Sequence, residues 1–225
     1  MRARFTVAEI GAAALEIVDR QGLEALSMRT LANALGTGPM TVYNYVKNRD
    51  ELEELVAEAI IGDVTLPARS DDWRADTAAL ATALWHGVRR HPNAIPLVLT
   101  RRTLSSSSYA GADRLIEAMG RGGLVGVDLL AAFRAVLSLV MGSAQAELAR
   151  PRAGVDRDRE QVAVAARIGG LAGTEHPHIA SLAQISQQST ARADFDRGLG
   201  FLLDGLASRA ADPANEPLGG GPDQR

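Results

Sequence analysis

The stretch SMRTLANALGTGPMTVYNYV, residues 27–46, decides the fold of the first part of this chain. It predicts two short helices joined by a tight turn, which is the arrangement of a helix-turn-helix motif. Ala32 is small enough for the second helix to cross over it, and Gly36 permits a sharp turn because it has no Cβ. Val42 and Val46 lie one helical turn apart, so we expect them to fill the space between the two helices.

The outer face of the second helix follows from the same periodicity, once Val42 and Val46 face inward. Side chains on that face can contact a base edge or a thymine methyl group, or donate a hydrogen bond to a phosphate. Two tyrosines that point outward from one short helix lack a packing reason, which favours a binding surface. The candidate DNA contacts are Arg29, Pro39, Met40, Thr41, Tyr43, Asn44, Tyr45, Lys47 and Arg49, with Arg2 and Arg4 as further cations.

Around this motif, apolar residues recur at a spacing of three to four, and no stretch alternates like a strand, so we expect an all-α fold. Thr6 with Glu9 predicts a capping box at the start of a first helix, which Gly22 ends, and Asn48 with Glu51 predicts another at the start of a fourth. The third helix is expected at 39–46. Later helices are expected at 73–91, 109–121, 127–150 and 190–209, with a serine loop at 104–108, a charged loop at 151–158 and weak helices within 159–189.

These elements divide the chain into three parts. We expect a three-helix helix-turn-helix domain at residues 1–64 and a larger helical domain at residues 65–211. Proline and glycine dominate residues 212–225, so we expect this tail to be disordered.

Charge and composition exclude several classes of protein. The 225 residues carry 24 Lys+Arg against 27 Asp+Glu, so nucleic acid would have to be bound by a local basic patch rather than a general basic surface. The absence of cysteine excludes disulfides, thiolate metal sites and cysteine catalysis. Acidic residues interrupt the apolar run near the N-terminus, and residues 124–141 are interrupted and short for a membrane span. We therefore expect a cytoplasmic protein without a membrane partner.

No arrangement typical of an enzyme or a metal site is visible. His86 and His91 do not share a helix face, and His176 and His178 flank a proline. Neither a GxSxG nor a GxxxxGK[ST] motif occurs, so we expect no catalytic residues, no metal and no cofactor. Two alternatives stay open at this point. A helical enzyme would show turnover when purified, and a helical interaction module without DNA binding would dimerise but not bind a duplex.

Residues 5–64 resemble the DNA-binding domain of the TetR family of bacterial repressors. The matching stretches are Ala13-Ala14-Leu15-Glu16, Gly22-Leu23-Glu24-Ala25-Leu26-Ser27-Met28-Arg29, Leu31-Ala32, Leu35-Gly36 and Thr41-Val42-Tyr43-Asn44-Tyr45-Val46-Lys47-Asn48-Arg49. The later chain is similar to the regulatory domain of the tetracycline-repressor branch, through Asp72-Trp73, the glycine-rich end of the middle helix, His176-Pro177-His178-Ile179 and Phe195-Asp196-Arg197-Gly198-Leu199.

This resemblance implies a homodimeric transcriptional repressor that a small-molecule effector releases from DNA. The third helix of each subunit would enter the major groove of a palindromic operator, and the matched DNA contacts are the nine residues proposed above. The second domain would bind the effector and form the dimer. In the tetracycline repressor a histidine on the short helix after the long one binds the drug's magnesium ion. Val98 stands near that place here, so we do not expect magnesium-tetracycline as the ligand.

The effector pocket is expected among the helices of the second domain. Its candidate lining residues are Trp85, His86, Met119, Phe133, Leu137 and Met141, and core packing is the alternative for each of them. Few of them are charged, which favours a largely apolar effector. The long helix at 73–91 begins one connector after the DNA-binding domain, so its start could transmit a movement to the fourth helix.

Dimerisation is expected through the helices at 127–150 and 190–209. The two helices of each subunit would form a four-helix interface. Gly198 and Gly205 would allow the backbones to approach closely. The apolar contacts expected at that interface are Leu129, Val136, Val140, Leu199, Leu202 and Leu206.

Overall fold

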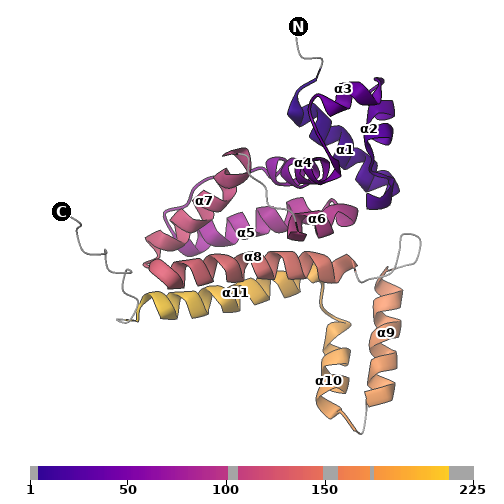
Figure 1. Ribbon diagram of the computed structural model, residues 1–225. Helices are drawn as coiled ribbons and strands as arrows, with labels where there is room; N and C mark the ends of the chain where they lie inside the picture. The colour runs from indigo at the N-terminus through magenta and orange to yellow at the C-terminus, as the bar shows by residue number, and fades with distance from the viewer. Residues whose placement is uncertain (1–4, 101–105, 149–156, 173–174, 213–225) are drawn as a thin grey trace, which may run out of the picture.

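The computed structural model describes residues 5–100, 106–148, 157–172 and 175–212. Within these ranges the chain forms α-helices and two short 3-10 helices and no strand, which confirms the predicted all-α fold. Figure 1 shows α1–α4 grouped beside the N-terminus, with the remaining helices on the other side of α4. The expected disordered tail, most of the charged loop, and the cations Arg2 and Arg4 lie outside the described residues.

The first group of helices is the helix-turn-helix domain. It contains α1 (Val7–Gln21), the 3-10 turn η1 (Leu23–Ala25), α2 (Met28–Ala34), α3 (Pro39–Tyr43) and α4 (Arg49–Gly62). Its core is formed by apolar side chains from all four α-helices, among them Ile10, Leu31, Val42 and Leu52. Ala32 is buried, and Gly36 has a φ of +60°, a conformation that favours glycine. Ala32 and Gly36 therefore lie in the helix pair as the sequence predicts, one buried in it and the other in its turn.

Helix α3 is shorter than predicted. Beyond Tyr43 the backbone tightens, and the amide of Tyr45 donates to the carbonyl oxygen of Val42, three residues back, at 2.9 Å. Such tighter turns commonly finish an α-helix. Val46 still reaches the interior, so Val42 and Val46 are both buried as predicted.

The capping boxes differ between α1 and α4. The Thr6 hydroxyl accepts from the Glu9 amide at 3.1 Å and the Glu9 carboxylate accepts from the Thr6 amide at 2.7 Å, which confirms the first box. At α4 only one of the two hydrogen bonds of the predicted capping box forms. Asn48 accepts from the Glu51 amide at 2.8 Å, but the Glu51 carboxylate reaches one residue further back and accepts from the Lys47 amide at 2.8 Å.

The second group of helices follows a connector, residues 63–72, that has no helix. It contains α5 (Trp73–Arg89), the 3-10 turn η2 (Pro92–Ala94), α6 (Ile95–Thr100), α7 (Ser106–Arg121), α8 (Gly126–Leu148), α9 (Arg157–Ala172), α10 (Pro177–Ser186) and α11 (Ala191–Ala210). Helix α7 begins three residues earlier than predicted, so the serines at 106–108 form its first turn rather than a loop.

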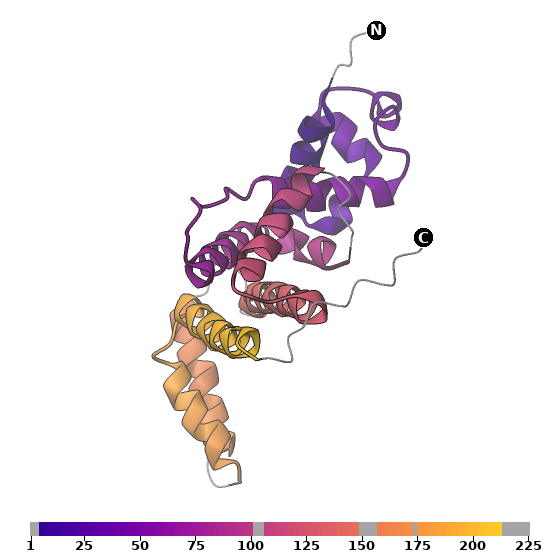
Figure 2. The ribbon, with the colours of Figure 1, turned by 90° about the vertical axis from the view of Figure 1, so that its left-hand side faces the viewer.

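These helices form a body and a projection. Helix α5 packs against α7 and α8, and α8 lies beside α11 in both views (Figures 1 and 2). Helices α9 and α10 pack against each other and extend away from the body (Figure 2). The stretch Gly126–Ala146 of α8 is long and apolar enough to cross a membrane by length and composition, a test that a central helix of a helical domain also passes.

Candidate nucleic-acid interface and internal cavity

The outer face of the helix-turn-helix carries most of the predicted DNA contacts. Met40 is 76% exposed and Tyr43 is 47% exposed, which is unusual for large apolar side chains in a domain with a closed core. Asn44 and Lys47 are exposed beside them, and Arg29 is exposed on α2. Pro39 is exposed and Thr41 is half-buried on the same short helix. The structure therefore brings these seven side chains to one motif: Arg29 lies on α2, four lie on α3, and Asn44 and Lys47 follow the end of α3.

Tyr45 does not lie on this outer face, contrary to the prediction that both tyrosines point outward. It is half-buried, its hydroxyl accepts from the Phe5 amide at 3.1 Å, and the two rings meet edge to face at 6.4 Å. The reason is helical spacing. Tyr45 stands three residues after Val42 and next to Val46, so it borders the buried face. Tyr45 thus holds Phe5 against the motif.

Arg49 is engaged at the start of α4. Its Nε donates to the Glu53 carboxylate at 2.8 Å, and its Nη2 donates to the Leu23 carbonyl oxygen at 3.3 Å. About half of the side chain is exposed, while Glu53 is nearly buried. Arg49 therefore braces α4 against η1, which sequence spacing alone does not indicate.

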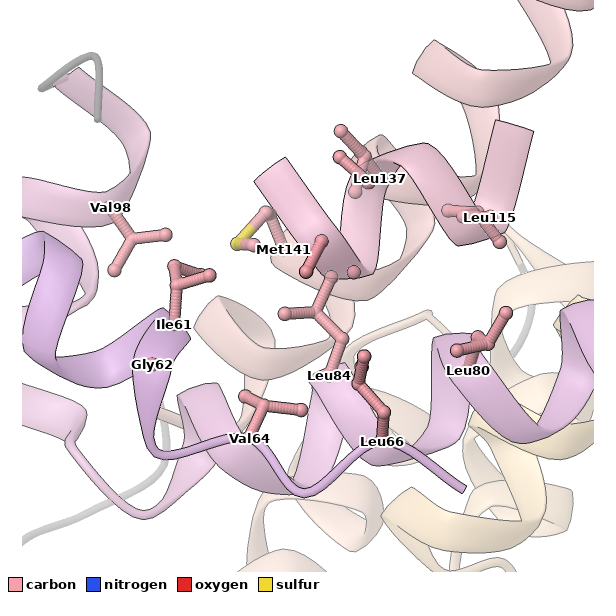
Figure 3. Close-up of a pocket in the computed structure, with 13 residues that line it drawn as sticks. Ile61, Gly62, Val64, Leu66, Leu80, Leu84, Val98, Leu115, Leu137 and Met141 are labelled. Atoms are coloured by element: carbon pink, nitrogen blue, oxygen red, sulfur yellow. The ribbon is translucent and has the colours of Figure 1, made fainter. Parts of the chain in front are cut away.

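An apolar cavity of about 380 Å³ lies where the two groups of helices meet (Figure 3). Figure 3 shows side chains from α4, the connector, α5, α6, α7 and α8 around it. None of its lining residues has a polar or charged side chain. They are Ile61, Gly62, Val64, Leu66, Leu80, Leu84, Val98, Ala110, Gly111, Ala112, Leu115, Leu137 and Met141.

Two of the six predicted pocket residues line this cavity, Leu137 and Met141, and so does Val98. The other four lie outside its lining. Met119 is fully buried and Phe133 is half-buried, and both belong to the core.

Trp85 and His86 have structural partners on α11 instead. Trp85 is fully buried and stacks on Phe195, with ring centroids 4.6 Å apart and an interplanar angle of 4°. His86 is exposed, and its Nε2 lies 2.7 Å from the Arg192 guanidinium. Both arrangements depend on a helix more than 100 residues later in the chain, which local sequence reasoning does not place.

The predicted dimer contacts need a similar correction. Val136, Val140 and Leu199 are buried inside the subunit, so they are not available to a partner. On the same two helices Val127, Leu130 and Phe201 are exposed, and Phe201 is 70% exposed. Both α8 and α11 therefore carry apolar residues on two faces, one packed in the subunit core and one exposed. Sequence spacing does not show which of the two faces is buried.

The fold and these features define a helix-turn-helix regulator: a DNA-binding motif, an apolar cavity behind it, and outward apolar helices. Comparisons with known proteins agree. The model of bacterial regulatory proteins of the tetR family matches residues 10–56, and the tetracyclin repressor-like C-terminal domain matches residues 66–210.

Individual relatives resemble this chain over nearly its whole length. It is 33% identical over 224 residues to the HTH-type transcriptional repressor DrrR1 of Streptomyces coeruleorubidus, covering 94% of this chain and 81% of that protein. It is 31% identical over 209 residues to an HTH-type transcriptional regulator of Saccharopolyspora erythraea, covering 92% and 86%. The structure of the TetR family protein ActR from Streptomyces coelicolor in complex with actinorhodin matches with a TM-score of 0.80 at 27% identity, covering 94% and 99%.

The chain belongs to the TetR family. It is a dimeric, ligand-responsive transcriptional repressor with an N-terminal helix-turn-helix and a helical C-terminal domain. The sequence resemblance implies the same class, and the comparisons confirm it.

Proposed function

We propose that α3 of each subunit enters the major groove of a palindromic operator and reads it with a small set of side chains. Tyr43 and Lys47 contact phosphates, and Asn44 reads a base edge. Arg29, Pro39, Met40 and Thr41 complete the surface. Tyr45 and Arg49 act behind it, because their hydrogen bonds fix Phe5 and the start of α4. In a symmetric dimer the two half-sites are roughly 34–36 Å apart, one DNA turn, or a multiple of that.

The bounds of the two proposed domains follow the helices. Residues 1–64 are the DNA-binding domain, which accords with the end of α4 at Gly62, and residues 65–211 are the regulatory domain, with 212–225 outside both. We propose regulation without catalysis, acting in the cytoplasm where the operator DNA lies. The relatives that match most of this chain are transcriptional regulators, which supports this proposal.

We propose that the apolar cavity is the effector site. Its volume falls in the usual range for small-molecule sites, about 300–1,000 Å³. Because its lining offers no charged or polar side chain, the effector is a largely apolar small molecule. The related ActR has been solved in complex with actinorhodin, which supports a small-molecule site in this fold.

One observation carries the regulatory role of the cavity. Ile61, Gly62, Val64 and Leu66 line it, and they belong to the end of α4 and the connector. An effector in the cavity therefore touches the DNA-binding domain itself. Only a molecule with different affinities for the operator-bound and released forms can shift the balance between them. Effector and operator must then weaken each other by the same factor.

A reciprocal titration tests this proposal. The operator is first located by footprinting the DNA that flanks the protein's own gene. A compound that binds the cavity should lower operator affinity by the factor by which the operator lowers its own affinity, typically on the order of 5–150-fold. Leu84→Gln places a polar group in the cavity wall and should weaken the compound while leaving operator affinity intact. A compound that binds tightly at the cavity and leaves operator affinity unchanged would refute the regulatory role.

A further inference from the structure

The connector between α4 and α5 is held by side chains of α7. Backbone groups in a segment without a helix are paired by side chains, by other backbone groups or by water. Arg114 donates to the carbonyl oxygen of Pro67, and Arg121 donates to those of Ser70 at 2.9 Å and Asp71 at 3.4 Å. Helix α7 therefore donates to three backbone carbonyl groups in the second half of the connector.

A third α7 residue binds the connector through its side chain. Glu117 accepts two parallel hydrogen bonds from the Arg69 guanidinium, at 2.7 and 2.8 Å. Such bidentate pairs fix geometry as well as adding attraction. Arg114, Glu117 and Arg121 lie at positions i, i+3 and i+7, so they share one face of the helix. We call these three residues the α7 clamp.

The clamp also reaches the start of α5. Asp76 is 1% exposed, and it accepts from Arg114 at 2.9 Å and from Arg121. A carboxylate buried this deeply is tolerated because it is paired, and removal of its partners would leave an uncompensated charge. Next to it the Trp73 ring covers Gly122, where a Cβ would overlap the indole. The clamp thus joins α7, the connector and the first turn of α5 into one unit.

Helix α7 faces the cavity as well. Ala110, Gly111, Ala112 and Leu115 line it, and so does Leu66 of the connector. A Cβ on Gly111 would lie 3.4 Å from the Leu66 side chain, so the connector and α7 are also in close apolar contact at the cavity edge. Any occupant that displaces α7 therefore acts on a helix to which the connector is bound by hydrogen bonds and ion pairs.

We infer that the α7 clamp transmits occupancy of the cavity to the DNA-binding domain. Its three residues are positioning residues for the effector response, in addition to the direct contact of the cavity with α4. The inference rests on the proposed function, since it takes the cavity as the regulatory site. The clamp prevents the connector from sliding along α7, so a shift of α7 moves the connector and, with it, the end of α4. If the clamp only stabilised the fold, its removal would not change the effect of cavity occupancy on the DNA-binding domain.

The test uses the full-length dimer and a filled cavity in place of an identified effector. Leu137→Trp fills the cavity from α8, a helix outside the clamp. The chain has no cysteine, so Asn33→Cys on the exposed side of α2 gives one spin label per subunit. Pulsed electron paramagnetic resonance then measures the distance between the two DNA-binding domains, and operator affinity is measured on unlabelled protein.

In the otherwise natural chain, we expect Leu137→Trp to change the label distance and to lower operator affinity about tenfold, inside the usual range for coupled sites. Glu117→Gln with Arg121→Gln removes the clamp's contacts with Arg69, Ser70 and Asp71, and leaves Arg114 on Pro67 and Asp76, so the buried charge stays paired. In that background both effects of Leu137→Trp should fall to within about twofold of none, while circular dichroism shows an intact fold. The control Asp196→Asn, which removes the exposed Arg192–Asp196 pair, should leave both effects in place.

The outcomes separate the two claims. If Leu137→Trp acts equally strongly with and without the clamp, the cavity is regulatory but the clamp does not transmit, and this inference is overturned. If Leu137→Trp changes neither label distance nor operator affinity in the natural background, the regulatory role of the cavity itself is refuted, and the inference with it.

Discussion

The DNA-binding domain and the outer helices of the regulatory domain bury their apolar residues differently. In α1–α4 the large apolar residues close around one core, and those left exposed include Met40 and Tyr43 on the proposed DNA face. In α8–α11 many stay exposed within one subunit: Val127, Leu130, Val162, Val164, Ile168, Ile179, Leu182, Ile185 and Phe201. The first region buries most of its large apolar residues within one subunit, whereas the second leaves a group of them exposed, which we expect a partner subunit to cover. Exposed apolar surface of this extent is what a dimer interface covers.

The largest effect is expected when a side chain is removed from the buried core of the DNA-binding domain. Leu52 is fully buried, so Leu52→Ala should lower the free energy of unfolding by about 2–5 kcal/mol. Met40→Ala, in the same domain but on an exposed face, should change it by less than about 0.5 kcal/mol. Urea unfolding followed by circular dichroism measures both. Equal stabilities for the two variants would show that the domain does not rely on this core.

The second largest effect is expected at the exposed apolar surface of α8–α11. Phe201→Glu places a charge at the most exposed large apolar residue of α11, so it should weaken subunit association by about 2 kcal/mol or more. The monomer should keep its helix content. Analytical ultracentrifugation at micromolar concentration should show monomers for Phe201→Glu and dimers for Phe201→Leu. A dimer that survives the glutamate would place the interface on other faces.

A smaller effect sharpens the contrast between the two tyrosines of the motif. Tyr45→Phe removes the hydroxyl that accepts from the Phe5 amide, and should cost about 0.5–1.5 kcal/mol of folding free energy. Tyr43→Phe removes an exposed hydroxyl, so stability should not change measurably. Thermal unfolding of the two variants side by side makes the comparison. A larger loss for Tyr43→Phe would mean that the inward and outward assignments are reversed.

The smallest effect concerns the cap of α1. Hydrogen bonds from the Thr6 amide and hydroxyl hold the pKa of the Glu9 carboxyl below its ordinary value of 4.5. A depressed pKa in the folded state means that the cap stabilises the domain above the ordinary value, and that this stabilisation is lost as the pH falls through the lowered pKa. A nuclear magnetic resonance titration of Glu9 should give a value under 4.5, and Glu9→Gln should reduce the loss of stability on acidification. A Glu9 pKa at or above 4.5 would contradict the capping geometry.

The motif could be predicted from sequence because its determinants are local. Gly36, Val42 and Val46 act within twenty residues of one another, and so do the caps, so periodicity and turn chemistry specify them. The prediction that Tyr45 points outward is wrong. The sequence already contained the signal, because its spacing from Val42 puts Tyr45 beside the buried face.

The cavity could not be predicted in the same way. Which apolar residues line it depends on how α4, α7 and α8 cross, and Trp85 is taken into the core by Phe195, 110 residues later. The α7 clamp likewise consists of pairs separated by 38 to 51 residues. Sequence spacing gives the face of a helix that is apolar, but not the helix that covers it.

The most direct test of the DNA-binding surface compares Asn44→Ala with Lys47→Ala on the footprinted operator and on an unrelated duplex. Lys47→Ala should weaken binding to both duplexes and reduce the slope of log affinity against log salt by roughly one for each phosphate that is no longer neutralised. Asn44→Ala should instead relax discrimination at one operator position by about 1–3 kcal/mol and leave the salt slope unchanged. If both variants keep full affinity and discrimination at physiological salt, α3 does not read the operator, and the proposed surface is wrong.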